Sequence, residues 1–296
     1  MSDRWGISQT TTAIVALVTA MFLLSTLSPV TKELFQAGNV SAYDLICFRI
    51  IIAFVFLASM SAFGSWRELK DLSRQDLIRL TVLGMIGVGI AYGCAGWSLM
   101  YTSVTHYSLI YSLGPALTAL FCFALKHDVP TRWKIAGILL SLAGCAYSIP
   151  EGFQNLEMGL GDALVFVFTL SISATIVLGA SVVKRRGAAT ATTVMFGSSM
   201  LMLLAGSFVL PTESTTQWTF HNGLLIAYLG LATAAIFFLR NLSLKSLPPT
   251  TVGGFHNLVP VFSILIATVF LGEQLTANEI LGGAAILSGT EMVRRG

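Results

Sequence analysis

The sequence predicts an all-α integral membrane protein. We expect ten transmembrane helices, arranged as two inverted five-helix repeats, with the N- and C-termini in the cytoplasm. Composition, the spacing of charged residues and a twice-written phrase predict this fold. Hydrophobic residues make up 55% of the 296 residues and charged residues only 10%, whereas a soluble domain carries about 25% charged residues. Most of the surface must therefore face lipid. The net charge of +3 is no sign of nucleic-acid binding, and we expect no nucleic-acid partner.

A helix needs about 20 residues to cross the hydrocarbon core. The uncharged run after Arg4 is too long for a signal-peptide core, so we interpret it as the first crossing. The uncharged stretch 80–125 is too long for one helix, and YTSVTHY (101–107) predicts a turn within it. In the last segment, only 11 uncharged residues separate Glu279 from Glu291. The ten expected segments are 9–31, 42–64, 77–101, 105–125, 132–150, 161–183, 188–210, 221–244, 250–271 and 276–293.

The distribution of Lys and Arg predicts the orientation, because cytoplasmic loops are enriched in them. With ten crossings and an inner N-terminus, 14 of the 17 Lys and Arg residues fall on the inner side. Lys32 falls outside, and Arg49 and Arg240 fall within helices. A wrong number of helices would scramble this segregation.

The two halves of the chain resemble each other at a shift of 145 residues. An odd number of helices in each copy makes the copies enter the membrane in opposite senses, which is an architecture of secondary transporters. We therefore expect repeats at 1–150 and 151–296. The matching pairs include Thr105 and Thr250, Leu113 and Leu258, Pro115 and Pro260, Ile135 and Ile280, Gly137 and Gly282, and Gly144 and Gly289.

The phrase SLIYSLGPAL (108–117) and its counterpart GFHNLVPVF (254–262) each place polar residues before a proline. A proline inside a helix frees the carbonyl four residues earlier, and free carbonyls in a membrane are tolerated in protein or beside a watery cavity. We expect Pro115 and Pro260 to kink the fourth and ninth helices near their centres and to bring the two phrases to one central place. Kinks that serve packing alone are the alternative.

The chain resembles the EamA-type ten-helix members of the drug/metabolite transporter superfamily, and is similar to its aromatic amino-acid exporters. The resemblance rests on the doubled five-helix pattern, on LGPALTALFCFALKHDVPTRWKIAGILLSLAGCAYSI (113–149) and on LVPVFSILIATVFLGEQLTANEILGGAAILSG (258–289). The turn at 126–128 departs from the Gly-Glu pattern that GEQL (272–275) follows. The resemblance implies a central cavity lined chiefly by helices 1, 3, 4, 6, 8 and 9, alternating access, and no nucleotide or metal cofactor.

The candidate substrate-binding residues are polar or aromatic side chains in the segments that the resemblance places at the cavity. Arg240 either binds substrate or snorkels to the inner headgroups, and for Arg49 we favour a structural role. His256 is either a hydrogen-bonding residue or a proton carrier, and the glycines of the third, fifth and tenth segments are expected to permit close packing. The candidates are Tyr92, Tyr107, Tyr111, Ser112, Phe237, Arg240, His256 and Asn257.

The scarcity of charged residues inside the membrane segments limits the classes of substrate that the protein could carry. No Asp or Glu lies deep in a segment, which argues against the carboxylate that a proton-coupled drug exporter needs. No Lys/Arg cluster lies at the midplane, which argues against phosphorylated substrates. We therefore expect export of a neutral or zwitterionic metabolite, first a hydrophobic or aromatic amino acid, with proton-coupled antiport of drugs or other metabolites as the alternative.

The sequence contains no recognisable set of catalytic residues, metal ligands or channel-filter residues. A membrane protein with only a scaffold role would not need a proline at the same place in both repeats. We expect no cofactor, a lipid bilayer and a small molecule as partners, a monomer as the simplest state, and the inner membrane of a bacterium as the location. The sequence leaves open the exact substrate, the net direction of transport and the oligomeric state.

Overall fold

The computed structural model describes residues 9–36, 40–64, 66–102, 107, 110–126, 131–148, 159–208, 216–271 and 276–296. These residues form helices and connecting turns, and no strand occurs among them. The α-helices are α1 (Gln9–Gln36), α2 (Ala42–Gly64), α3 (Trp66–Lys70), α4 (Arg74–Gly84), α5 (Ala91–Tyr101), α7 (Gly114–Ala124), α8 (Arg132–Ser148), α9 (Leu160–Arg186), α10 (Ala188–Ser207), α11 (Phe220–Ser243), α12 (Pro249–Gly254), α13 (Leu258–Leu271) and α14 (Ala277–Arg295).

Two of the long helices contain a stretch of different geometry. A π-helical turn, η1 (Met85–Ile90), joins α4 to α5 without a break, and a 3₁₀ turn, η2 (Phe255–Asn257), joins α12 to α13. Such turns are uncommon in helices and often mark functional positions. The second of them lies in the repeated phrase.

Seven helices within the described residues are long and apolar enough to cross a membrane. They correspond to the first, second, third, sixth, seventh, eighth and ninth predicted segments. The other three predicted segments are represented by α7, α8 and α14, which are shorter or less apolar. The predicted turn at 101–107 lies mostly outside the described residues, as do the turn at 126–128 and GEQL.

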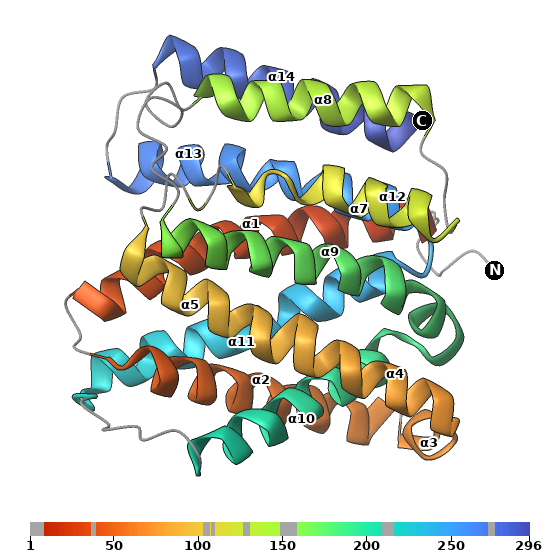
Figure 1. The fold of residues 1–296 in the computed structure, drawn as a ribbon, viewed down its shortest axis with the longest axis vertical. Helices are drawn as coiled ribbons and strands as arrows, with labels where there is room; N and C mark the ends of the chain where they lie inside the picture. Colours follow the sequence, from red (N-terminus) through yellow and green to blue (C-terminus); the bar gives the residue numbers. More distant parts are fainter. Residues whose placement is uncertain are drawn as a thin grey trace.

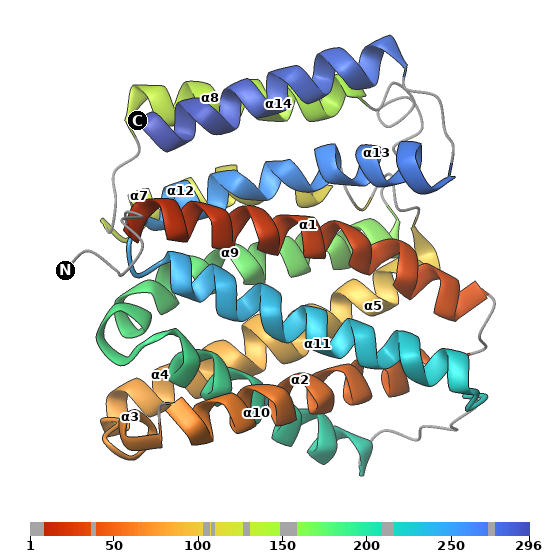
Figure 2. The same ribbon diagram turned by 180° about the vertical axis from the view of Figure 1, so that it is seen from behind.

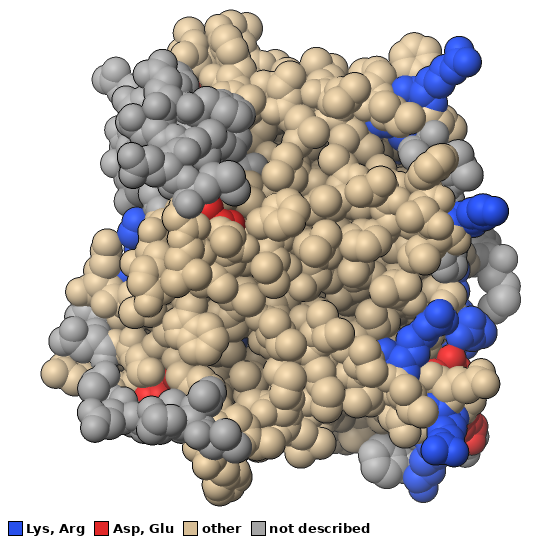
Figure 3. Space-filling model, in the orientation of Figure 1, with Lys and Arg blue, Asp and Glu red and all other residues tan. Residues whose placement is uncertain are grey.

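The helices lie side by side in a stack, with α8 and α14 at one end and α2 and α10 at the other (Figures 1 and 2). The start of α1 and the end of α14 lie at the same edge of the stack (Figure 1). Most of the Lys and Arg side chains visible on this face lie at that edge (Figure 3). Since cytoplasmic loops are enriched in Lys and Arg, we refer to this edge as the inner edge.

A charged cluster fastens the helices at the inner edge. Asp76, at the start of α4, accepts hydrogen bonds from Nη2 of Arg185 at 2.7 Å and from Nε of Arg186 at 2.8 Å, at the end of α9. Gly187 then turns the chain into α10 with a φ of +85°, a value that favours glycine. This junction therefore holds α4, α9 and α10 together.

The prolines of the repeated phrase lie at helix starts rather than at helix centres. Pro115 is the second residue of α7, after a turn at residues 112–113, and Pro260 is the third residue of α13, after η2. A proline in the first turn of a helix removes no intrahelical hydrogen bond, because the first N–H groups have no partner there. The fourth and ninth segments are therefore interrupted at the phrase instead of being bent within one continuous helix.

The glycines of α8 and α14 confirm the packing predicted for them. A Cβ built on Gly144 would lie 2.6 Å from the carbonyl oxygen of Gly282, and one built on Gly137 would lie 2.5 Å from that of Gly289. These helices touch backbone to backbone, as small residues allow in membranes.

Candidate functional site

The two copies of the repeated phrase contact each other. The rings of Tyr111 and His256 lie with their centres 5.8 Å apart, and these residues are counterparts at the 145-residue shift. A second pair of counterparts also touches: the hydroxyl of Ser141 donates to the carbonyl oxygen of Ile286 at 3.3 Å. The interruptions before α7 and α13 thus bring polar side chains from distant segments together.

An aromatic cluster surrounds this meeting point. Tyr107 and Tyr111 stack at 6.2 Å with an angle of 19° between their rings, which confirms that they share one face. Phe168 of α9 contacts Tyr92, Tyr107 and Tyr111, with ring centres 5.5 to 6.0 Å apart. Such pairs of rings add about 0.5–1.5 kcal/mol each beyond their buried area. The cluster is therefore a preformed apolar wall.

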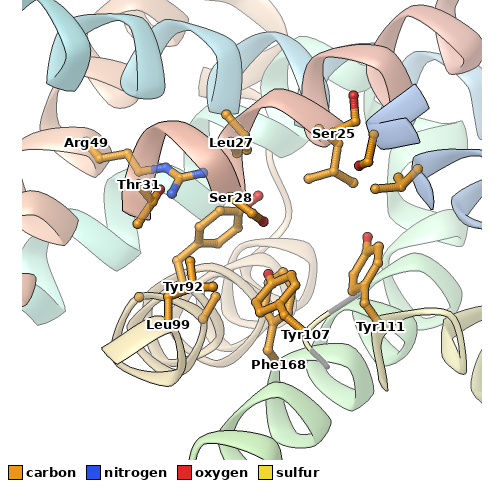
Figure 4. A pocket seen from close by; sticks show the side chains of 15 residues that line it. Ser25, Leu27, Ser28, Thr31, Arg49, Tyr92, Leu99, Tyr107, Tyr111 and Phe168 are labelled. Carbon is orange, nitrogen blue, oxygen red and sulfur yellow. The ribbon is translucent and has the colours of Figure 1, made fainter. Parts of the chain in front are cut away.

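This wall encloses a narrow cavity with a volume of about 30 Å³, which is room for a few water molecules. Figure 4 shows the hydroxyl of Tyr111 pointing across the space toward side chains of α1, and Arg49 reaching in beside Thr31. The cavity is lined by Leu24, Ser25, Leu27, Ser28, Thr31, Arg49, Tyr92, Ala95, Gly96, Leu99, Tyr107, Tyr111, Phe168, Val259 and Ser263.

Arg49, for which the sequence favoured a structural role, lines the cavity in addition to making contacts with other helices. Its Nε donates to Oγ1 of Thr233 on α11 at 2.6 Å, and its Cζ lies 4.5 Å from the centre of the Tyr92 ring. The side chain is 7% exposed. Thr233 and Tyr92 thus hold the guanidinium in place while one side of it faces the space.

Arg240 does not snorkel, because it is only 2% exposed. Its Cζ lies 4.1 Å from the centre of the Phe237 ring, and Phe237 in turn lies 5.7 Å from Tyr92. Neither residue lines the cavity. Both lie one aromatic layer behind it, toward the inner end of α11.

The remaining candidates are buried near the cavity without lining it. His256 has its Nδ1 3.2 Å from the carbonyl oxygens of both Val252 and Gly253, which is the hydrogen-bonding interpretation of this residue. Asn257 is 1% exposed, and within the described part of the chain its side-chain amide has no hydrogen-bonding partner. Ser112 is also buried. Of the eight candidates, the structure brings Tyr92, Tyr107 and Tyr111 to the cavity itself.

The resemblance implied that the first and sixth segments, α1 and α9, line the cavity, but the candidate list named no residue of either helix. Ser25, Ser28 and Thr31 follow one another at intervals of three residues on α1 and face the cavity. This spacing puts hydroxyl groups on one side of an otherwise apolar helix, and that signal was available in the sequence. Phe168 carried no such signal, because phenylalanine is as common on a lipid-facing surface as in a core.

Residues 11–149 and 159–295 both match the EamA-like transporter family. The chain belongs to this family. It is therefore a multi-pass membrane protein of a family of transporters, as the sequence predicts.

Relatives of this EamA-like protein include bacterial and plant proteins. It is 24% identical to the uncharacterized transporter YyaM of Bacillus subtilis, over 74% of each chain. It is 23% identical to the protein WALLS ARE THIN 1 of Arabidopsis thaliana, over 99% of this chain and 85% of that one. A solved crystal structure covers 95% of this chain with a TM-score of 0.75 at 20% identity, which shows the fold alone. Within the described residues, no group of three His, Cys, Asp or Glu could hold a metal ion.

Proposed function

We propose that this EamA-like protein exports small neutral or zwitterionic metabolites, first of all hydrophobic or aromatic amino acids, through the central cavity. The observation that carries the proposal is the combination of an aromatic wall with hydroxyl groups and one arginine around a single space. Rings of Tyr107, Tyr111 and Phe168 suit an aromatic side chain. Arg49 suits a carboxylate, and the hydroxyls of α1 suit an amine.

The small size of the cavity supports alternating access as the mechanism. Sites for small molecules have volumes of about 300–1,000 Å³, whereas this cavity has about 30 Å³. An amino acid can therefore enter only if the surrounding helices separate. The interruptions before α7 and α13 supply places where backbone angles can change without breaking a long helix, as in other transporters built from repeats.

The proposal includes ten crossings with both termini in the cytoplasm, as inverted repeats at 1–150 and 151–296 in a bacterial inner membrane. The contacts between counterparts support it, since residues related by a two-fold axis touch each other only near that axis. Tyr111 meets His256 and Ser141 meets Ile286 in this way. The gathering of Lys and Arg at one edge (Figure 3) supports the orientation.

The experiment is flux of radiolabelled phenylalanine and threonine in proteoliposomes. We expect saturable flux with phenylalanine preferred. In Tyr111→Ala we expect a loss of about 30-fold or more, because truncating an aromatic anchor typically costs about 2 kcal/mol or more. The matched control is Phe63→Ala, which removes an aromatic side chain that is 94% exposed. Absence of amino-acid flux from folded protein would refute the substrate assignment.

The same vesicles test proton-coupled antiport of drugs. An imposed pH gradient that drives uptake of a cationic drug, with no effect on phenylalanine flux, would favour that alternative. Amino-acid flux that follows only its own gradient would favour a facilitator.

A further inference from the structure

One edge of the Arg240 guanidinium is buried and lacks a hydrogen-bonding partner among the residues that the structure describes. Its Nε and Nη2 are both buried and, within the described part of the chain, have no hydrogen-bonding partner. These two nitrogens lie on the same side of the planar guanidinium and form the edge that pairs with both oxygens of one carboxylate. The edge therefore has the geometry of a carboxylate site.

No acidic side chain among the described residues fills this edge. Among the described residues, the buried acidic side chains are Asp76 and Asp162. Asp76 is bound by two arginines at the inner edge, and Asp162 accepts a hydrogen bond from Thr102 at 2.6 Å at the start of α9, near the outer edge. The ring of Phe237 is the aromatic contact of Arg240, and it compensates only part of the cost of burying an unpaired charge.

The two buried arginines lie on opposite sides of the aromatic cluster. Arg49 is the eighth residue of α2, which begins at the outer edge, and Arg240 is the fourth residue from the end of α11, which ends at the inner edge. A line of contacts joins them: Arg49 lies over Tyr92, Tyr92 contacts Phe237, and Phe237 lies under Arg240. Of these residues, Arg49 and Tyr92 line the cavity.

We propose that Arg240 is an inner carboxylate-binding site of the transport path, paired with Arg49 as the outer one, so that substrates must carry a carboxylate while an amine is dispensable. This inference rests on the proposed function, since it assigns chemistry to the same path. When the inner half of the stack opens, displacement of Phe237 exposes the edge of Arg240 to the substrate. The carboxylate then passes along the Tyr92 side of the cavity to Arg49.

The charges of the path favour this class of substrate over an amine. Two guanidinium groups, which stay protonated, repel an ammonium group, and the described membrane core offers no carboxylate to hold one. The hydroxyl groups and aromatic rings of the cavity bind an ammonium group more weakly than a carboxylate side chain of the protein would bind it. An organic acid that lacks the amine thus keeps the principal contact, and an amine that lacks the acid loses it.

The test is thermal unfolding of the purified protein in detergent, in a low-chloride buffer. The three probes are phenylalanine, 3-phenylpropanoate and 2-phenylethylamine. We expect the first two to raise the unfolding midpoint of the native protein and 2-phenylethylamine to leave it unchanged. In Arg240→Lys, which keeps the charge and loses the two-pronged edge, we expect about 10- to 100-fold weaker binding of 3-phenylpropanoate.

A second variant separates binding from a structural role. Arg240→Met replaces the unpaired charge with an apolar side chain of similar length, so we expect the ligand-free midpoint to rise and the response to 3-phenylpropanoate to disappear. Arg79→Met, which removes an exposed arginine of the inner side, is the matched control and should keep the response. A fall of the ligand-free midpoint in Arg240→Met would overturn the proposal, because the guanidinium would then be satisfied within the protein.

The outcomes distinguish this inference from the proposed function. A response to 3-phenylpropanoate without one to phenylalanine would support the carboxylate site and refute amino-acid transport. A response to phenylalanine that survives in Arg240→Met, or an equal response to 2-phenylethylamine, would refute the carboxylate site and leave amino-acid transport standing. An Arg240-dependent response to chloride alone would overturn the carboxylate assignment in favour of an inorganic anion.

Discussion

Two neighbouring glycines of α14 allow a sharp test of how α8 and α14 pack. We predict that Gly282→Ala lowers the thermal stability of the protein, whereas Gly283→Ala does not. A Cβ on Gly282 would lie 2.5 Å from the backbone carbonyl oxygen of Gly144, while a Cβ on Gly283 meets nothing within 4 Å. The side chain of Ser148, also close to Gly282, can rotate away, but the carbonyl of Gly144 belongs to a helix backbone.

The expected magnitude follows from the difference between the two variants. Each gains up to about 1 kcal/mol because alanine favours the helix more than glycine does. Only Gly282→Ala also forces the helices apart, and overpacking typically costs about 1–3 kcal/mol. Since the helix term is common to both, their stabilities should differ by about 1–3 kcal/mol. That corresponds to roughly 2–12 °C in the unfolding midpoint, at about 2–4 °C per kcal/mol for a chain of this size class.

The assay is thermal unfolding in one detergent, followed by the fluorescence of a thiol-reactive dye that reports exposure of the buried cysteines. The native protein and both variants are measured at the same scan rate, because unfolding in detergent is not reliably reversible. Equal midpoints for the two variants, or a lower one for Gly283→Ala, would refute the close contact between α8 and α14.

Two further predictions concern polar contacts that hold the helices and the site. Asp76→Asn removes the carboxylate bound by Arg185 and Arg186 at 2.7 and 2.8 Å. Because both arginines are partly exposed, we expect the free energy of unfolding to fall by only about 1 kcal/mol, and the difference from the native protein to shrink at about 1 M salt. An unfolding midpoint that is unchanged at low salt would contradict this role. Thr233→Val keeps the shape of the side chain but removes the oxygen that accepts a hydrogen bond from Nε of Arg49 at 2.6 Å. We expect the free energy of unfolding to fall by about 1.5–3 kcal/mol, a loss that Thr233→Ser largely avoids. Equal unfolding midpoints for the two variants would show that Thr233 does not hold the guanidinium.

The sequence predicted the structural class well, because class depends on properties that add up along the chain. Three features can be recognised without knowing which residues touch: the low charge content, the apolar segments of membrane length, and the similarity of the two halves at a shift of 145 residues. Seven of the expected segments are helices long and apolar enough to cross a membrane, and the close packing of the glycines of α8 and α14 was also foreseen. Pro115 and Pro260 lie where the fourth and ninth segments change geometry, although they begin α7 and α13 instead of bending a continuous helix.

The site itself depended on the tertiary structure. Arg49 and Arg240 look alike in the sequence, each an arginine near the end of an apolar segment, yet one lines the cavity and the other lies buried behind Phe237. Which side of a helix faces a cavity is set by the neighbours that pack around it, and those neighbours come from segments far away in the chain. Phe168 joins the aromatic wall for the same reason. The sequence by itself thus determined that this chain forms helices in a membrane, and only packing between helices decided which of its few polar groups meet.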